Sequence, residues 1–432
     1  MKSPRAKAAT ARAPRRWRTP PPLTRGSAES LEGMEILREV PGETGVLLWQ
    51  AYRNVMFWAT AEPGDRGTLF SPDAAQRRLS ELLAADLPAA IVDALVAVGR
   101  MLGAPDATSG ESIAESSRTI SDWAEQHGHT ATALAFTQAA ALASPRSASL
   151  ALAVGKLARE RSELPRAETW YRHAIMIARQ IGDWSVYGRA YLSLGNMARN
   201  RGNFPAAHRM HIKALRSAKR KGLSGIVGES SHDLFVIATE MGRSEQAEHY
   251  ARQAFRAYGA EHELLPALAH DIAYYWMDQG YFARALPVLE ALEPLFLDLK
   301  QKLPVRANVI RAAGAAGDRE LFRKMWNETN KLTREVEASP VVADSLLEMA
   351  RGAASLGEWD RAEQVAERAV AVASERGQAA VVVRAESVLA SIRSGRSVEK
   401  AIAARAGRTS DQADALANEM VRSLSSRTAV QV

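Results

Sequence analysis

The sequence lacks cysteine entirely, although it is 432 residues long. This absence excludes disulfides, thiolate nucleophiles and cysteine-ligated metal sites. Aromatic residues are also scarce, at 6% against 47% hydrophobic residues overall, so we expect a core built mostly from Ala, Leu and Val. Long apolar runs are missing too. The best candidate, residues 87–99, is interrupted by Asp93 and falls short of the ~18 residues that a membrane-spanning helix needs.

The N-terminus is basic, but it does not resemble a secretory signal. Pro20, Pro21 and Pro22 stand where the apolar core of a signal peptide would lie. We therefore expect no signal peptide and a cytoplasmic protein. Residues 1–30 are rich in Pro, Ala and Arg, a composition that predicts a disordered basic tail.

The net charge of +7 is unevenly distributed. Of the 56 Lys and Arg residues, eight lie in residues 1–28, which contain no acid. The remaining 48 cations face 49 acids, a net charge of −1 for the rest of the chain. The tail is thus a candidate contact for nucleic acid, although Trp17 is its single aromatic residue and stacking on bases finds weak support there.

Residues 31–104 have the spacing of a helical region. Apolar residues recur at helical intervals through 44–60, and Ser71 followed by Pro72 is typical of a helix start. A linker follows, and from residue 111 to 395 the sequence repeats. One small turn residue marks each unit: Gly128, Ser162, Gly202, Gly242, Gly280, Gly317, Gly357 and Gly395. Such a sustained period indicates a solenoid of stacked helix pairs.

Similar chemistry surrounds each marker. Five residues after it stands a small or apolar residue: Ala133, Ala167, Ala207, Ala247, Ala285, Phe322 and Ala362. We expect the marker to end one helix in a left-handed conformation and the alanine to lie where the next helix crosses the first most closely. Each pair leaves an apolar face that the following pair buries.

These features resemble the tetratricopeptide repeat, most clearly in YLSLGNMARNRGNFPAAHRMHIKAL at 191–215. The resemblance implies an all-α solenoid, a right-handed superhelix of about seven antiparallel helix pairs. The fifth repeat departs from the pattern because Phe322 replaces the expected alanine. Residues 396–432 are expected to form C-terminal capping helices.

Evidence for catalysis is sparse: the sequence has no glycine-rich phosphate loop and no serine elbow. His208 and His211 share a helix face, but no third ligand stands at a useful spacing, so packing is favoured over metal binding for His211. We therefore expect a protein that is not an enzyme and that needs neither a cofactor nor a metal ion.

The resemblance implies a concave face lined by the first helix of each pair. Cations recur there in register, which suits a peptide or protein partner with acidic groups or a free C-terminal carboxylate. The candidate groove residues from this pattern are Lys156, Arg159, Asn196, Arg199, Tyr274, Arg311 and Arg351.

Two His-Asp pairs stand at the same phase of neighbouring repeats. They are His232 with Asp233, in SHDLF at 231–235, and His270 with Asp271, in AHDIA at 269–273. Two interpretations stay open: a structural role, as a hydrogen bond between repeats or a helix-start preference, or a part of the binding groove.

The leading hypothesis is an adaptor or regulatory protein that holds a peptide or protein in its concave groove. One alternative is a ligand- or peptide-sensing transcriptional regulator that contacts nucleic acid through its basic N-terminus, although residues 31–102 show no clear helix-turn-helix. Another is a hydrolase that uses the His-Asp pairs, against which the lack of a nucleophile argues.

Overall fold

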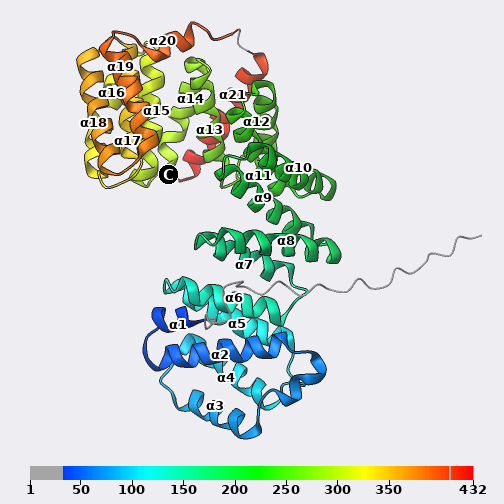
Figure 1. Ribbon diagram of the computed structural model, residues 1–432. Helices are drawn as coiled ribbons and strands as arrows, with labels where there is room; N and C mark the ends of the chain where they lie inside the picture. The colour runs from blue at the N-terminus through cyan, green and yellow to red at the C-terminus, as the bar shows by residue number, and fades with distance from the viewer. Residues whose placement is uncertain (1–32, 408–409, 432) are drawn as a thin grey trace, which may run out of the picture. The chain divides into compact units, whose positions relative to one another are not determined.

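A computed structural model describes residues 33–407 and 410–431 of the chain, and every regular element in these residues is a helix (Figure 1). The basic tail at 1–30 lies outside the described residues. The chain divides into two compact units, one up to Lys221 and one from Gly222 onward. Within the described residues, none of the helices combines the length and apolar character that crossing a membrane requires.

The first unit opens with an N-terminal helical region and continues with three helix pairs. The N-terminal region consists of α1 (Met34–Glu39), α2 (Gly42–Thr60), the 3-10 helix η1 (Pro63–Thr68), α3 (Pro72–Ala84) and α4 (Ala89–Gly103). The pairs are α5 (Gly110–Gln126) with α6 (Thr130–Ala143), α7 (Ala148–Glu160) with α8 (Leu164–Ile181), and α9 (Trp184–Asn200) with α10 (Phe204–Lys221).

The N-terminal region is fixed to the repeats by a helix cap. Glu39, at the end of α1, accepts hydrogen bonds of 2.8 Å from the backbone N–H groups of Ala131 and Thr132 at the start of α6. These N–H groups have no partner inside their own helix, and a carboxylate also complements the helix dipole there. Trp58 of α2 is fully buried, and its indole N–H donates to the carbonyl of Pro105 at 2.8 Å.

The second unit continues the same architecture with four further pairs. They are α11 (Ser224–Glu240) with α12 (Ser244–Tyr258), α13 (Leu265–Asp278) with α14 (Phe282–Leu292), α15 (Leu299–Ala316) with α16 (Arg319–Glu335), and α17 (Val342–Ser355) with α18 (Trp359–Glu375). The remaining elements are the 3-10 helix η2 (Glu293–Leu295), α19 (Ala379–Arg393), α20 (Val398–Ala403) and α21 (Asp411–Gln431).

Every predicted marker residue has a positive φ, which confirms its role in ending a helix. At Gly202, for example, φ is 72°, and the backbone N–H of the next residue, Asn203, donates back to the carbonyl of Ala198 at 2.9 Å. This bond closes the helix end in the manner of a Schellman motif. Ser162 occupies the same conformation at φ 62° despite its side chain, which costs about 1–2 kcal/mol relative to glycine.

The small residue after each marker lies at a tight crossing between helices. The alanines predicted for this position are all fully buried, and Phe322 replaces alanine there with equally full burial. In the same repeat, α15 instead approaches the next first helix, α17, very closely: a Cβ added to Gly314 would meet the carbonyl oxygen of Gly352 at 2.3 Å. Two facing glycines therefore let these backbones touch.

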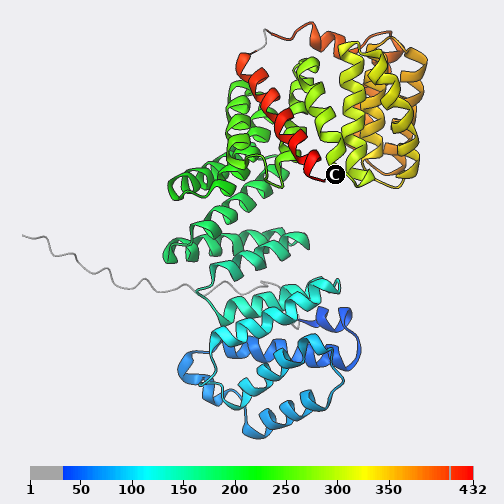
Figure 2. The ribbon, with the colours of Figure 1, turned by 180° about the vertical axis from the view of Figure 1, so that it is seen from behind.

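The C-terminal helices fold back over earlier parts of the second unit. Helix α21 packs along α14, and Figure 2 shows it, in red, in front of the green helices. Arg284 of α14 and Asp414 of α21 form an ion pair of 2.6 Å, and Arg427 donates to the carbonyl of His262 at 2.9 Å. The short helix α20 packs against α17.

Candidate functional site

Both predicted His-Asp pairs contribute to one polar cluster on the first helices of the second unit. His232 Nε2 of α11 lies 2.9 Å from Asp271 Oδ2 of α13. His270 Nδ1 lies 3.7 Å from the other oxygen of the same carboxylate, and Asn308 Nδ2 of α15 lies 3.0 Å from His270 Nε2. We call His232, Asp271, His270 and Asn308 the histidine–aspartate cluster. It joins three successive first helices, so the inter-repeat hydrogen bond is present.

The hydrogen bonds assign the ring protons. An amide nitrogen only donates, so Asn308 donates to His270 Nε2, and the His270 proton sits on Nδ1 facing Asp271. The His232 proton sits on Nε2, which donates to Asp271, and His232 Nδ1 accepts from the Tyr258 hydroxyl at 3.5 Å. Burial alone would raise the pKa of Asp271, but the bonds from His232 and His270 outweigh it and hold that pKa well below its usual range.

The cluster has the form of a base with an orienting carboxylate, yet its nearest hydroxyl is a poor nucleophile. Burial raises the pKa of Tyr258, and the carboxylates of Glu229, Asp233 and Asp271 raise it further. The phenol therefore stays protonated near neutral pH. The Asp271 side chain is 44% exposed, whereas the His232 side chain is only 15% exposed. Solvent therefore reaches the Asp271 carboxylate more readily than the His232 imidazole.

The prediction that Arg311 would hold a partner's carboxylate is wrong. Arg311 is fully buried, and its guanidinium forms three ion pairs within the chain: with Asp278 at 2.8 Å, Glu348 at 3.0 Å and Glu399 at 3.2 Å. Burial would lower the pKa of Arg311, but the carboxylates of Glu348, Glu399 and Asp278 raise it above its usual value. The charge is neutralised internally.

Arg351 is engaged in the same network, contrary to its predicted role. Its Nε lies 2.6 Å from Glu399 Oε1, and its guanidinium also contacts Glu348 at 3.3 Å. The aromatic ring of the half-buried Tyr274 lies 5.5 Å from the Arg311 guanidinium carbon, so Tyr274 contacts the network. We call Arg311, Arg351, Glu348 and Glu399 the buried ion network.

The predicted residues of the first unit are more exposed. Lys156 and Arg159 on α7 have side chains 62% and 40% exposed, and both lie about 4 Å from Glu160 in weak surface ion pairs. Asn196 and Arg199 of α9 are half-buried. These four residues belong to the first unit, whereas the histidine–aspartate cluster belongs to the second.

His211 is a packing residue, as the sequence indicated. It is fully buried, and its ring lies where a Cβ on Gly195 would stand, at 2.3 Å from His211 Nε2. The preceding repeat uses Tyr171 against Gly155 in the same way. Burial, together with smaller contributions from the nearby Arg199 and His208, lowers the pKa of His211 to about 3. Among the described residues, no group of three potential ligands could hold a metal ion.

Sequence reasoning missed Asn308, Glu348 and Glu399. Asn308 could have been found, because it lies 38 residues after His270, which is one repeat. Glu348 had a similar signal, because it lies about one repeat after its partner Arg311, whereas Glu399 had none. Glu399 reaches the network from α20, 88 residues beyond Arg311, and no repeat period connects the two.

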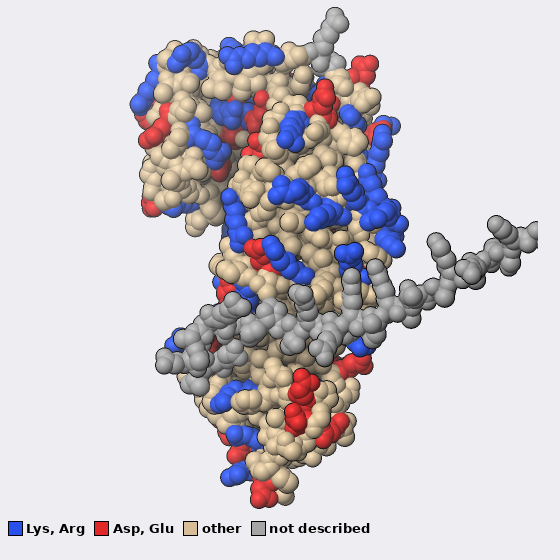
Figure 3. All heavy atoms as spheres, turned by 45° about the vertical axis from the view of Figure 1, so that its right-hand side comes forward, with Lys and Arg blue, Asp and Glu red and all other residues tan. Residues whose placement is uncertain are grey.

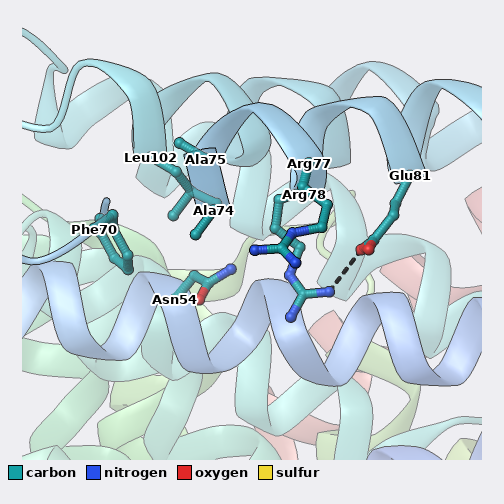
Figure 4. Close-up of a pocket in the computed structure, with 8 residues that line it drawn as sticks. All are labelled: Asn54, Phe70, Ala74, Ala75, Arg77, Arg78, Glu81 and Leu102. Carbon is teal, nitrogen blue, oxygen red and sulfur yellow. Dashed lines mark hydrogen bonds and ion pairs between the residues drawn. The ribbon is translucent and has the colours of Figure 1, made fainter. Parts of the chain in front are cut away.

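Two cavities lie away from these residues. One, of about 290 Å³, lies between α2, α3 and α4, where Asn54, Arg77 and Arg78 meet and Arg78 is paired with Glu81 (Figure 4). The other, of about 370 Å³, lies between α12 and α21 and is lined by Arg252, Arg256 and Glu419 among others. Both are open and carry charges of both signs.

Comparison with known proteins agrees with the repeat architecture. The tetratricopeptide-repeat family model matches residues 188–221, which are α9 and α10. A solved STAND signal-transduction ATPase with a tetratricopeptide-repeat sensor, from Pyrococcus horikoshii, is 13% identical with a TM-score of 0.50; the match covers 85% of this chain and 59% of that one. A search of curated proteins found no match.

Two further solved structures show weaker similarity. The crystal structure of BtubC from P. vanneervenii is 16% identical with a TM-score of 0.41, covering 54% of this chain and 94% of that one. The Rap conjugation gene regulator of the plasmid pLS20, in complex with the Phr* peptide, is 15% identical with a TM-score of 0.35, covering 85% of this chain and 98% of that one. The matched repeat at 188–221 and the helix pairs on either side of it show the tetratricopeptide-repeat fold.

Proposed function

We propose that the chain is a non-enzymatic adaptor or regulatory protein that binds an extended peptide segment on the first helices of its second unit. The observation that carries the proposal is the histidine–aspartate cluster, a polar group shared by α11, α13 and α15 with its carboxylate 44% exposed. Helices that are merely packed together would not need a half-exposed carboxylate held by two imidazoles.

The exposed chemistry of this face favours a partner that presents hydrogen-bond donors. Asp271 and Asp278 have side chains 44% and 42% exposed, whereas the arginines that would attract an acidic partner are occupied by internal carboxylates. A peptide with Lys or Arg side chains, or with free backbone N–H groups, complements such acceptors. The acidic or C-terminal partner expected from the sequence depended on Arg311 and Arg351.

The same chemistry supports a binding role over catalysis. The cluster pairs a base with an orienting carboxylate, but the hydroxyl beside it belongs to Tyr258, whose pKa is raised by burial. Among the described residues, this base has no activated nucleophile beside it, and nucleophilic hydrolysis requires one.

Selection from a random peptide library on the immobilised full-length chain tests this function. We expect the enriched peptides to carry Lys or Arg, and their affinity to fall about tenfold in Asp271→Asn, which corresponds to ~1.4 kcal/mol. Asp122→Asn is the matched control, because Asp122 is an exposed aspartate of α5 with an ion pair of its own. No enrichment, or equal binding to all three proteins, would contradict the proposal.

A further inference from the structure

A continuous stretch of the first unit contains cations and no acid. Between Asp183 and Glu229 the sequence holds nine Lys and Arg residues without a single Asp or Glu. Six of the nine lie on α10, and all six are exposed: Arg209, Lys213, Arg216, Lys219, Arg220 and Lys221. The near-neutral total charge of the chain beyond the tail therefore conceals a strongly positive surface.

Four of these cations form a stripe along one side of α10. Arg209, Lys213, Arg216 and Arg220 follow one another at intervals of four, three and four residues, which places them on one helix face over ~16 Å. We call these four residues the α10 stripe. In Figure 3 blue side chains gather where α10 lies, with little red among them. Neither Arg209 nor Arg216 has an acidic partner among the described residues.

Three other second helices pair a cation with an acid on the same helix. Arg172 pairs with Glu168 on α8, Arg252 with Glu248 on α12, and Lys331 with Glu335 on α16. Like charges at these intervals destabilise a helix by roughly 0.2–0.5 kcal/mol per pair, so the α10 stripe does not stabilise the fold. The last-turn cations complement the helix dipole, but Arg209, Lys213 and Arg216 lie too early in α10 for that.

Aromatic rings lie beside the stripe. Trp184, Tyr187 and Tyr191 of α9 form a row of edge-to-face contacts, with ring centroids 5.4 and 4.9 Å apart, and all three are half-buried. Lys221 and Lys213 lie over the first and last rings, at 4.8 and 5.2 Å from their centroids. Proteins bind single-stranded nucleic acid through cations interleaved with partly exposed aromatic rings, because phosphates contact the cations and bases stack on the rings.

We infer that the α10 stripe, with the aromatic row beside it, is a sequence-independent binding surface for single-stranded nucleic acid. The stripe binds the phosphates. Bases stack on the aromatic row once Lys213 and Lys221 move from its rings toward the strand. This surface consists of residues of α9 and α10 in the first unit, and it shares no residue with the histidine–aspartate cluster or with the basic segment 1–30. Its contacts neutralise phosphates and release counterions, which makes the affinity fall steeply with salt.

Salt-dependent binding of a fluorescent 20-nucleotide strand to the full-length chain, measured by anisotropy, tests the inference. The variant Arg209→Gln/Arg216→Gln/Arg220→Gln keeps helix propensity and removes three contacts. We expect it to bind at least tenfold more weakly at low salt and to reduce the slope of log K against log salt by about 2, since each contact to a single strand contributes about 0.7.

The control removes the same charge elsewhere. Arg323→Gln/Lys324→Gln/Arg334→Gln changes three exposed cations of α16, and it should leave both affinity and slope unchanged. All variants retain the basic tail, so a tail contact would affect each of them equally. Equal losses in the two triples, or no loss in either, would overturn the inference.

Other polyanions are included as separate arms. Duplex of the same length should bind more weakly than the single strand, because stacking on the aromatic row is lost. Tighter duplex binding would overturn the assignment to single strands. Vesicles containing phosphatidylserine, and polyglutamate, are the other two probes. If either binds as tightly as the oligonucleotide, and the α10 triple variant loses that binding too, the surface binds anions in general. That result would overturn the assignment to nucleic acid.

Discussion

At the scale of single residues, the contact between Gly195 and His211 shows how the repeat constrains side-chain choice. The imidazole fills the position that Tyr171 fills one repeat earlier, and each ring packs against a glycine of the preceding helix. His211 is fully buried and neutral, with its pKa lowered to about 3. A side chain selected for shape thus introduces a titratable group into the core.

This group should make the first unit sensitive to acid. Because the pKa of His211 is depressed in the folded state, the unfolded chain binds the extra proton between about pH 6.5 and pH 3. Stability therefore falls as pH falls through that window, by about 1.4 kcal/mol per pH unit. From pH 7 to pH 5 the contribution of His211 is about 2 kcal/mol, and His211→Phe should remove it.

Urea unfolding at pH 7 and pH 5 measures this contribution. The loss of unfolding free energy between the two pH values should be smaller in His211→Phe by about 2 kcal/mol. His249→Phe, which changes an exposed histidine of α12, should leave the loss unchanged. His173 is also buried with a lowered pKa, so some acid sensitivity should persist. An identical pH dependence in both variants and the unmodified chain would contradict the assignment.

At the scale of elements, the short helix α20 is held by charge rather than by apolar area. Its Glu399 is buried between Arg311 and Arg351, and Ser397 just before it contacts Ser355 of α17 at 3.2 Å. Removing one partner from a buried ion pair costs about 3–5 kcal/mol, because the remaining charge stays desolvated. Glu399→Gln should therefore lower the unfolding free energy of the second unit by about 3 kcal/mol.

Chemical denaturation of the full-length variant checks this value. Glu363→Gln is the matched control: Glu363 pairs with Arg393 at 2.6 Å, but both side chains are exposed, at 40% and 53%. Solvent screens an exposed ion pair, so the control should be nearly unchanged. Equal stabilities for the two variants would show that the buried ion network does not hold α20.

The same network shows which part of the site could be predicted from the sequence. The His-Asp pairs were recognisable because they recur at one repeat period, and Asn308 follows the same period. The internal ion pairing of Arg311 was not recognisable, because its partner Glu399 lies on α20, beyond the end of the repeats. A periodic pattern predicts contacts between neighbouring repeats, whereas a chain segment that folds back obeys no period.

At the scale of the whole molecule, the helix pairs follow directly from the sequence. Every marker has the left-handed backbone that was expected, and each alanine five residues later is fully buried. Local chemistry determines both features, since a helix end needs positive φ and a close crossing needs a small side chain. The path of α20 and α21 back onto α17 and α14 depends instead on Glu399, Asp414 and other single contacts.

The proposed peptide binding depends on the first helices of the second unit. Peptide binding is proposed for the face that carries the histidine–aspartate cluster, and the second helices α12 and α16 have no part in it. The second helices therefore serve as an internal reference in any experiment that maps a bound peptide onto the chain.

Hydrogen exchange of the full-length chain, with and without a saturating basic peptide from the library selection, tests this central claim most directly. Bound peptide should slow amide exchange in α11, α13 and α15, because it covers their shared polar cluster and stabilises their helical hydrogen bonds. Exchange in α12 and α16 should stay the same. Protection confined to those second helices, or no change at saturation, would contradict the account.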